Sequence, residues 1–229
     1  MIEKQRAPTL YGRNKGHKLK ARQQGLMDTL LPQLAVDPTA PAPARVADLF
    51  PVPVDEIWLE AGFGGGEHMI HQAETHDDVG IIGCEPFING MAKAVSAIDL
   101  TGLENIRLYN GDATDVLDWL PEASLSRMYL LYPDPWPKRR HWKRRFISAE
   151  MLDRVARALK PGAEFRVASD IPHYIAWTLA HLRDHPAFEW TARKADDWRE
   201  PYDGWPGTRY EAKAIREGRT PTYLTFKRV

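Results

Sequence analysis

Short apolar runs alternate with segments of helical periodicity along most of the chain after residue 55. Each run ends at Gly, Asp or Pro, and this pattern is typical of buried strands in a parallel sheet. The runs that predict strands are 56–62, 79–85, 106–112, 126–132 and 163–170. Apolar periodicity predicts helices at 66–76, 87–100, 113–120, 147–159 and 171–184. Two later segments, 188–194 and 222–229, predict closing strands.

This alternation of strands and helices indicates an α/β fold, with a mostly parallel sheet covered by helices on both faces. The chain has 229 residues, of which 43% are hydrophobic, and this size fits one domain. The first 44 residues differ from the rest. The segment from Lys4 to Arg22 holds seven Lys or Arg, with Glu3 beside it, and the Pro- and Ala-rich stretch 36–45 follows. We therefore expect a basic N-terminal extension and linker at 1–44 and a single domain at 45–229.

Overall charge and cysteine content narrow the class of protein further. Lys plus Arg and Asp plus Glu both number 31, so attraction to a polyanion must come from local clusters of charge. Cys84 is the single cysteine, which excludes an internal disulfide and suits a reducing compartment. The sequence holds no run near the roughly 18 apolar residues of a membrane span. We expect a soluble, cytoplasmic protein that does not bind membranes.

Acidic residues end or follow the predicted parallel strands. In an open parallel sheet the ligand binds at the carboxyl ends of the strands, so these side chains are expected at one edge. An acid at the start of a helix can also be explained by capping and by the helix dipole. Five acids at one edge favour a binding site over capping alone, and they are Glu60, Glu85, Asp112, Asp134 and Asp170.

The glycine run after the first predicted strand argues against a dinucleotide cofactor. From Gly62 the sequence reads GFGGGE, so Glu67 stands where the third glycine of the G-x-G-x-x-G fingerprint belongs. A pyrophosphate on this turn would also approach Glu60, and two like charges repel in a shielded site.

S-adenosylmethionine suits the same residues better, because it carries no phosphate. Glu60 suits the positive methionine end, Glu85 suits the ribose hydroxyls and Asp112 suits the adenine amine. Gly62 and Gly64 would let the backbone approach the cofactor closely. The residues therefore favour S-adenosylmethionine as the cofactor.

The stretch LYPDPWPKRRHWKRR, at 131–145, joins a fixed acid to the densest positive charge of the chain. Three prolines at alternate positions restrict the backbone around Asp134 and Trp136. Trp136 could stack on a base or simply pack the turn. Six of the eight residues from Lys138 to Arg145 are Lys or Arg, which suits contacts with several phosphates. A solvated helix face is the ordinary alternative for such a run, and its position beside Asp134 favours nucleic-acid binding.

The stretch LYPDPWPKRRHWKRRF resembles the signature of the TrmB family, the bacterial tRNA (guanine-N7-)-methyltransferases. The acid before the glycine run, GCEPF, NGDA, Asp170 and TRYE at 208–211 follow in the family's order, from about residue 45 to the C-terminus. The resemblance implies a Rossmann-like class I S-adenosylmethionine-dependent methyltransferase, with a mostly parallel seven-stranded sheet that ends in an antiparallel hairpin. It also implies transfer of a methyl group to N7 of a guanine in tRNA, the variable-loop guanine. The sequence is compatible with either a monomer or a homodimer.

The resemblance also implies a role for each matching residue. Asp134 would be the catalytic residue. The cofactor contacts would be Glu60, Glu85, Asp112 and Asp134. The substrate contacts would be Lys138, Asp170, Thr208, Arg209, Tyr210 and Glu211. The tRNA contacts would be Arg140, Lys143, Arg144 and Arg145.

Three other interpretations account for these residues less well. Exocyclic-amine methyltransferases of DNA or RNA carry an acid-Pro-Pro-aromatic loop after the fourth strand, but here one proline separates Asp134 from Trp136. A non-catalytic RNA-binding protein would have no need of an acid at every strand end. Zinc chemistry is disfavoured because one Cys and scattered His, such as His68 and His71, form no ligand set, so we expect no metal.

Overall fold

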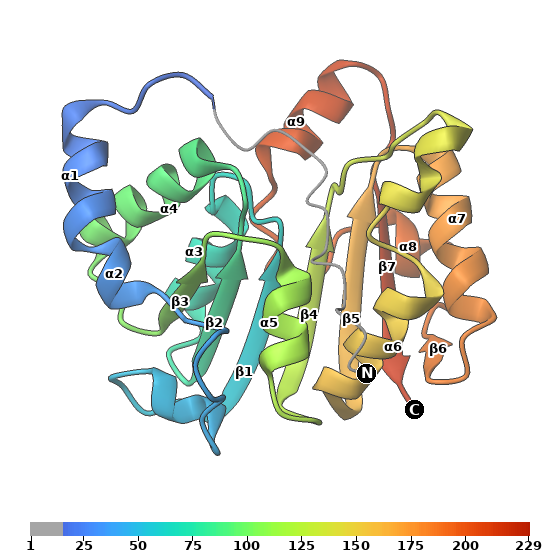
Figure 1. The fold of residues 1–229 in the computed structure, drawn as a ribbon. Coiled ribbons are helices and arrows are strands. Elements are labelled where there is room, and N and C mark those ends of the chain that lie inside the picture. Colours follow the sequence, from blue (N-terminus) through green and yellow to red (C-terminus); the bar gives the residue numbers. More distant parts are fainter. Residues whose placement is uncertain (1–15) are drawn as a thin grey trace.

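The computed structural model describes residues 16–229, and these contain one sheet of seven strands in the order β3-β2-β1-β4-β5-β7-β6 (Figure 1). The strands are β1 (Glu56–Ala61), β2 (Val79–Cys84), β3 (Ile106–Tyr109), β4 (Leu125–Leu131), β5 (Leu159–Ser169), β6 (Phe188–Trp190) and β7 (Thr222–Arg228). The first five strands are parallel, β7 is antiparallel to β5, and β6 is antiparallel to β7. The predicted α/β fold with a closing antiparallel pair is confirmed.

Five helices follow the strands near the predicted positions. They are α3 (Glu67–Thr75), α4 (Ile88–Thr101), α5 (Ala113–Trp119), α6 (Ala149–Ala158) and α7 (Pro172–Arg183). The sequence did not predict α1 (Ala21–Thr29), α2 (Leu31–Leu34), α8 (Asp196–Arg199), α9 (Arg209–Arg216) or the 3-10 helices η1 (Val46–Leu49) and η2 (Arg139–Arg144). Three of these, α2, α8 and η1, have four residues each and are too short to show a periodic apolar pattern.

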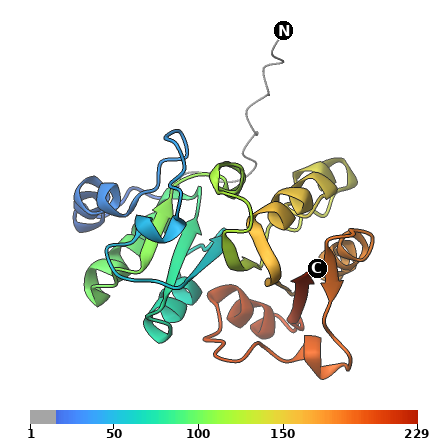
Figure 2. The same ribbon diagram turned by 90° about the horizontal axis from the view of Figure 1, so that it is seen from below.

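Two buried clusters lie on opposite faces of the sheet, because successive side chains of a strand point to opposite sides. In β1, Ile57 and Leu59 pack in the cluster that includes α5, α6 and α7, whereas Trp58 packs in the cluster that includes α1, α3 and α4. Figure 2 shows α3 and α4 on the opposite side of the sheet from α5 and α6. All six residues of β2 are buried, as expected of a strand covered on both faces.

Part of the segment before residue 45 packs on the sheet and helices. Arg22 in α1 forms an ion pair of 2.6 Å with Asp99 in α4, and the Val36 N–H donates to the Leu108 carbonyl of β3. Asn89, near the start of α4, accepts a hydrogen bond from the N–H of Gly16 at 2.7 Å. Residues 16–36 are therefore held along α4 and β3, and most of the predicted basic segment lies before residue 16, outside the described residues.

Candidate active site

A cavity of about 480 Å³ lies at the edge where the parallel strands end. It is lined by the segments that follow β1, β2, β3 and β4 and by the start of α9. β1 and β4 are neighbours at its centre, and the chain order of the strands reverses direction between them. Open α/β sheets bind their ligands at this point. Figure 1 shows α9 beyond the same edge.

The glycine turn after β1 forms one wall of the cavity. Gly62 and Gly64 have φ angles of 73° and 61°, in the left-handed region that glycine adopts without a steric penalty. The Gly64 N–H donates to the Glu85 carboxylate at 2.6 Å. A Cβ on Gly90 of α4 would lie 2.2 Å from the Gly64 carbonyl oxygen, so Gly90 allows the helix to approach this turn.

Glu85 lies directly after β2, lines the cavity and is 7% exposed. Its two oxygens accept hydrogen bonds from the N–H groups of Gly64, at 2.6 Å, and Phe87, at 2.8 Å. Burial raises the pKa of the Glu85 carboxyl, while these backbone donors and the nearby Arg209 act in the opposite direction. Each oxygen keeps lone-pair capacity, so the carboxylate can accept further hydrogen bonds from a ligand.

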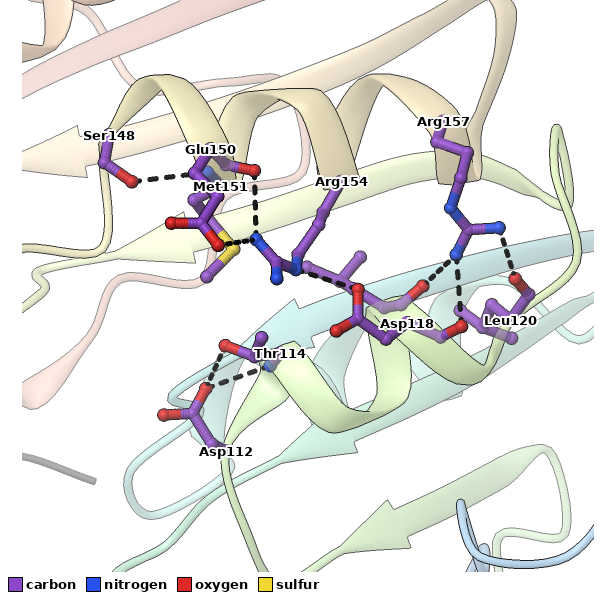
Figure 3. Close-up of polar contacts among 10 residues, drawn as sticks. Asp112, Thr114, Asp118, Leu120, Ser148, Glu150, Met151, Arg154 and Arg157 are labelled. Carbon is purple, nitrogen blue, oxygen red and sulfur yellow. Dashed lines mark hydrogen bonds and ion pairs between the residues drawn. The ribbon is translucent and has the colours of Figure 1, made fainter. Parts of the chain in front are cut away.

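Asp112 combines the two roles considered for a strand-end acid. It is the N-cap of α5, where one carboxylate oxygen accepts from the Thr114 N–H at 2.9 Å and from the Thr114 hydroxyl at 2.7 Å. Figure 3 shows the second oxygen directed away from Thr114. Because Asp112 also lines the cavity, that oxygen can serve a ligand while the first holds the helix.

Glu60 is not brought to the cavity lining. Its carboxylate lies 2.6 Å from Nδ1 of His68 in α3, and both side chains are buried. Tyr129 and Trp205 pack against the His68 ring at 4.6 and 5.1 Å. The reason is that successive side chains of a strand point to opposite faces of the sheet. Glu60 shares a face with Trp58, and the next residue, Ala61, lines the cavity.

The loop after β4 presents Asp134 to the cavity. Tyr132 and Trp136 have φ angles of 51° and 40°, a conformation that costs a residue with a side chain about 1–3 kcal/mol. Asp134 lies between them, exposed at the mouth of the cavity. The surrounding protein nevertheless excludes enough water to raise the pKa of its carboxyl. Backbone strain of this kind persists where the surrounding structure holds it, often at functional sites.

The basic run forms η2 and divides into exposed and buried side chains. Lys138, Arg140 and Lys143 are exposed and available to a polyanion. Arg144 is half-buried, with its guanidinium 4.9 Å from the centre of the Trp136 ring. Arg145 is only 5% exposed and points under the loop, so the predicted phosphate contact does not fit its position.

Helix α9 carries the TRYE segment, and two of its four residues hold the helix in place. The Thr208 hydroxyl accepts from the Glu211 N–H at 3.1 Å, and the Glu211 carboxylate accepts in return from the Thr208 N–H at 3.3 Å. Glu211 is buried and also accepts from Trp205 Nε1 at 2.8 Å and from the Tyr223 hydroxyl. This T-x-x-E capping box was a visible signal for α9 that the apolar pattern alone missed.

The other two residues of the segment, Arg209 and Tyr210, line the cavity. The Tyr210 ring is stacked with Tyr132 at a centroid distance of 6.5 Å and an interplanar angle of 20°. The Arg209 guanidinium lies 4.9 Å from the centre of the Tyr210 ring. Its positive charge favours the ionised form of Glu85 and so acts to lower the pKa of that carboxyl. These side chains place α9 over the glycine turn and the loop that carries Asp134.

Asp170 is not brought to the cavity lining either. It follows β5 and forms an ion pair of 2.5 Å with Arg219, which also pairs with Glu217. Sequence reasoning missed several lining residues, including Phe87, Thr114 and Met151. Phe87 is the last residue of the motif GCEPF and Thr114 directly follows NGDA, so position after a strand-end acid was the available signal.

The fold and the site together define a class. A mostly parallel sheet with a closing antiparallel pair, a glycine turn after β1 and acids after β2 and β3 at one cavity are the features of a Rossmann-like, S-adenosylmethionine-dependent methyltransferase. Among residues 16–229, no helix is long and apolar enough to cross a membrane. The same residues contain no group of three or more His, Cys, Asp or Glu side chains that could hold a metal ion.

Comparisons with known proteins identify the family. The family model described as "Putative methyltransferase" matches residues 55–224. A tRNA (guanine-N(7)-)-methyltransferase of Azorhizobium caulinodans is 58% identical over 229 residues, covering 100% of this chain and 99% of the relative. Another, from Rhizobium meliloti, is 59% identical over 218 residues, covering 95% and 94% of the two chains. The chain belongs to the TrmB family of tRNA (guanine-N7-)-methyltransferases, as its sequence motifs predicted.

A more distant solved structure confirms the fold. The rRNA methylase from Streptococcus thermophilus superposes with a TM-score of 0.53 at 11% sequence identity, covering 80% of this chain and 92% of that one. At this identity the likeness concerns the arrangement of strands and helices alone.

Proposed function

We propose that this protein transfers a methyl group from S-adenosylmethionine to N7 of a guanine in tRNA, the variable-loop guanine, forming N7-methylguanosine. One observation carries the proposal: Glu85, Asp112 and Asp134 line a single cavity that opens beside the exposed cations of η2. The near-full-length relatives named for the same reaction support it. A cytoplasmic location is part of the proposal, because the substrate is tRNA and the lone Cys84 forms no disulfide.

The cavity fits S-adenosylmethionine by its donor and acceptor set. The Glu85 carboxylate suits the ribose hydroxyls, and the second oxygen of Asp112 suits the adenine amine. Gly62 and Gly64 leave the turn after β1 open to close approach by the methionine portion. When bound, the cofactor supplies a methyl group on a positively charged sulfur. Glu60 is left out of this set because its carboxylate pairs with His68 away from the cavity.

Asp134 acts on the base and not as a general base. Guanine N7 already carries a lone pair and no proton, so nothing has to be removed before it attacks a methyl group. We propose that the carboxylate accepts hydrogen bonds from the guanine N1–H and amino group, which are free once the base leaves its stack. As N7 gains the methyl group the ring becomes cationic, and these hydrogen bonds strengthen in the transition state.

The exposed cations Lys138, Arg140 and Lys143 would hold the tRNA backbone beside the cavity, and Trp136 would offer a ring to a base. The basic extension before residue 16 would add to this surface. Gly16, the first described residue, donates a hydrogen bond to Asn89 at the start of α4 and lies close to the cavity-lining Phe87. Gly16, where the described residues begin, therefore lies beside the proposed site.

Purified protein with labelled S-adenosylmethionine and unmodified tRNA tests the proposed reaction. We expect label in tRNA at one guanine. Treatment with base should then cause strand scission at that position, because N7-methylation weakens the glycosidic bond. Label on an exocyclic amine, which gives no scission, would identify the alternative class of methyltransferase. No transfer to any RNA would contradict the proposed function.

Replacing Arg140 and Lys143 together by Ala is expected to weaken tRNA binding and to flatten its dependence on salt. Removing one interaction with a phosphate lowers the slope of log K against log salt by a little under one unit. Filter-binding titrations at several salt concentrations measure this slope. Glu150→Ala on α6, which removes an exposed acid nearby, is the control for a general change of surface charge. A double variant with the parental slope would show that these two side chains do not contact RNA.

Asp112→Ala is expected to reduce S-adenosylmethionine affinity and the stability of α5 together. An unpaired polar group on the ligand costs roughly 1 to 3 kcal/mol, and loss of an N-cap costs about 1 kcal/mol. Asp112→Asn keeps an oxygen for Thr114, so it should retain the melting temperature and still lose cofactor affinity. Calorimetric titration and thermal denaturation separate the two effects. Parental cofactor affinity in Asp112→Asn would mean that Asp112 is a helix cap alone.

A further inference from the structure

Arg145 occupies an environment unlike that of the other cations in the basic run. Its side chain is 5% exposed. The guanidinium carbon lies 4.7 Å from the centre of the Trp177 ring, 5.1 Å from Trp142 and 5.6 Å from Tyr174. Burial lowers its pKa. Aromatic faces hold a guanidinium well, but they also shield it from any contact with an RNA backbone.

The hydrogen bonds of Arg145 go to the loop that carries Asp134. Its Nε donates to the Pro135 carbonyl at 3.0 Å, and one terminal nitrogen lies 3.3 Å from the Trp136 carbonyl and 3.1 Å from His173 Nδ1. Within residues 16–229, no carboxylate forms an ion pair with Arg145. Burying a charge without a carboxylate is costly, so the position needs a reason.

The conformation of the loop supplies that reason. Pro133, Pro135 and Pro137 have no N–H, so every second residue of this loop lacks a backbone donor. Tyr132 and Trp136, at either end of the segment, are in the left-handed region. A fork of N–H donors on two adjacent carbonyls fixes the turn at Pro135 and Trp136 in an orientation that the backbone alone does not maintain.

We propose that Arg145 is a positioning residue that clamps the 132–136 loop and thereby aims Asp134 into the cavity. This inference rests on the proposed methyltransferase function. Arg145 acts through the backbone, because its hydrogen bonds to this loop go to the carbonyls of Pro135 and Trp136. The adjacent Arg140 and Lys143 act on RNA, so one basic run serves two purposes.

The test compares Arg145→Lys with Arg183→Lys, the same substitution at an exposed arginine at the end of α7. Lysine keeps the charge and most of the stem but cannot donate to both carbonyls in a fixed fork. At saturating tRNA and cofactor, Arg145→Lys should lower the single-turnover rate by about ten- to a hundredfold, the scale of a small misplacement of a catalytic group. For tRNA binding, the slope of log K against log salt (the salt slope) should be the same in Arg145→Lys as in the parent. Arg183→Lys should keep both the parental rate and the parental slope of tRNA affinity against salt.

Chemical rescue adds a readout that loss of folding does not produce. Guanidinium or methylguanidinium ions added at millimolar concentration should restore part of the rate of Arg145→Ala and leave the parental rate of Arg183→Ala unchanged. If Arg145→Ala does not fold, the rate and slope of Arg145→Lys decide the question. A parental rate for folded Arg145→Lys, or a salt slope lowered by about one unit, would overturn the positioning role. Failure of the parental protein to methylate tRNA would instead overturn the proposed function.

Discussion

Asp134→Asn is expected to reduce the single-turnover rate of methyl transfer by about a hundredfold or more, the scale on which removal of one preorganised electrostatic interaction acts. Asparagine keeps the shape of the side chain but replaces one acceptor oxygen by a donating NH₂. That NH₂ would face the N1–H and amino donors of the guanine. S-adenosylmethionine affinity should change much less, because Glu85 and Asp112 remain.

The measurement is a rapid-quench assay at saturating tRNA and cofactor, with cofactor affinity determined separately by calorimetry. Asp153→Asn, an exposed acid on α6 that is paired with His185, is the matched control and should keep the parental rate. A near-parental rate for Asp134→Asn would remove Asp134 from the chemistry and leave substrate positioning as the source of catalysis.

The pH dependence of the rate follows from the state of the same carboxyl. Both oxygens of Asp134 can accept from the two guanine donors only when the carboxyl is ionised, because protonation turns one oxygen into a donor. Desolvation raises the pKa of this carboxyl above the ordinary value of 3.8. The rate at saturation should therefore have its full value well above the raised pKa and should fall as the pH is lowered through it. This fall should occur at a higher pH than for an ordinary aspartate. Glu85 also has a raised pKa, but its protonation should weaken cofactor binding. Saturating cofactor separates the two groups, and Asp134→Asn should remove the acid limb of the rate profile.

Strand alternation explains both what the sequence predicted of the site and what it did not. Glu85, directly after β2, and Asp134, three residues after β4, were predicted at the cavity and line it. Glu60 lies within β1, one position before Ala61, and a shift of one residue turns a side chain to the opposite face. Strand β1 is buried on both faces, so its apolar pattern does not indicate to which face the Glu60 side chain points.

The basic run shows a second limit of sequence reasoning. Arg144 and Arg145 are adjacent, and nothing in their local sequence says that only the second is buried. The buried position depends on Trp142 together with Tyr174 and Trp177, which α7 brings from 29 and 32 residues further along the chain. The left-handed conformations of Tyr132 and Trp136 were equally hidden, because glycine is the residue whose presence signals that region.

Glu85→Ala is expected to cause the largest loss of cofactor affinity. The substitution removes the proposed acceptor for the ribose hydroxyls and leaves the Gly64 and Phe87 N–H groups without their carboxylate partner. Each unpaired buried group costs roughly 1 to 3 kcal/mol, so affinity should fall at least tenfold and the melting temperature should decrease. Binding of tRNA should be nearly unchanged, because the exposed cations of η2 are on a different segment.

Glu85→Gln separates the structural part of this effect from the ligand contact. Glutamine keeps one acceptor oxygen for a backbone N–H, but its NH₂ would face the other N–H, so only part of the turn is held. It should therefore lie between the parent and Glu85→Ala in melting temperature while still losing cofactor affinity. Glu67→Ala, an exposed acid at the start of α3, controls for loss of negative charge near the glycine turn and should bind the cofactor as the parent does. Calorimetry with S-adenosylmethionine and with tRNA measures the affinity of each variant for both ligands. A Glu85→Ala protein that loses tRNA binding but keeps its cofactor affinity would show that the strand-end acids were assigned to the wrong ligand.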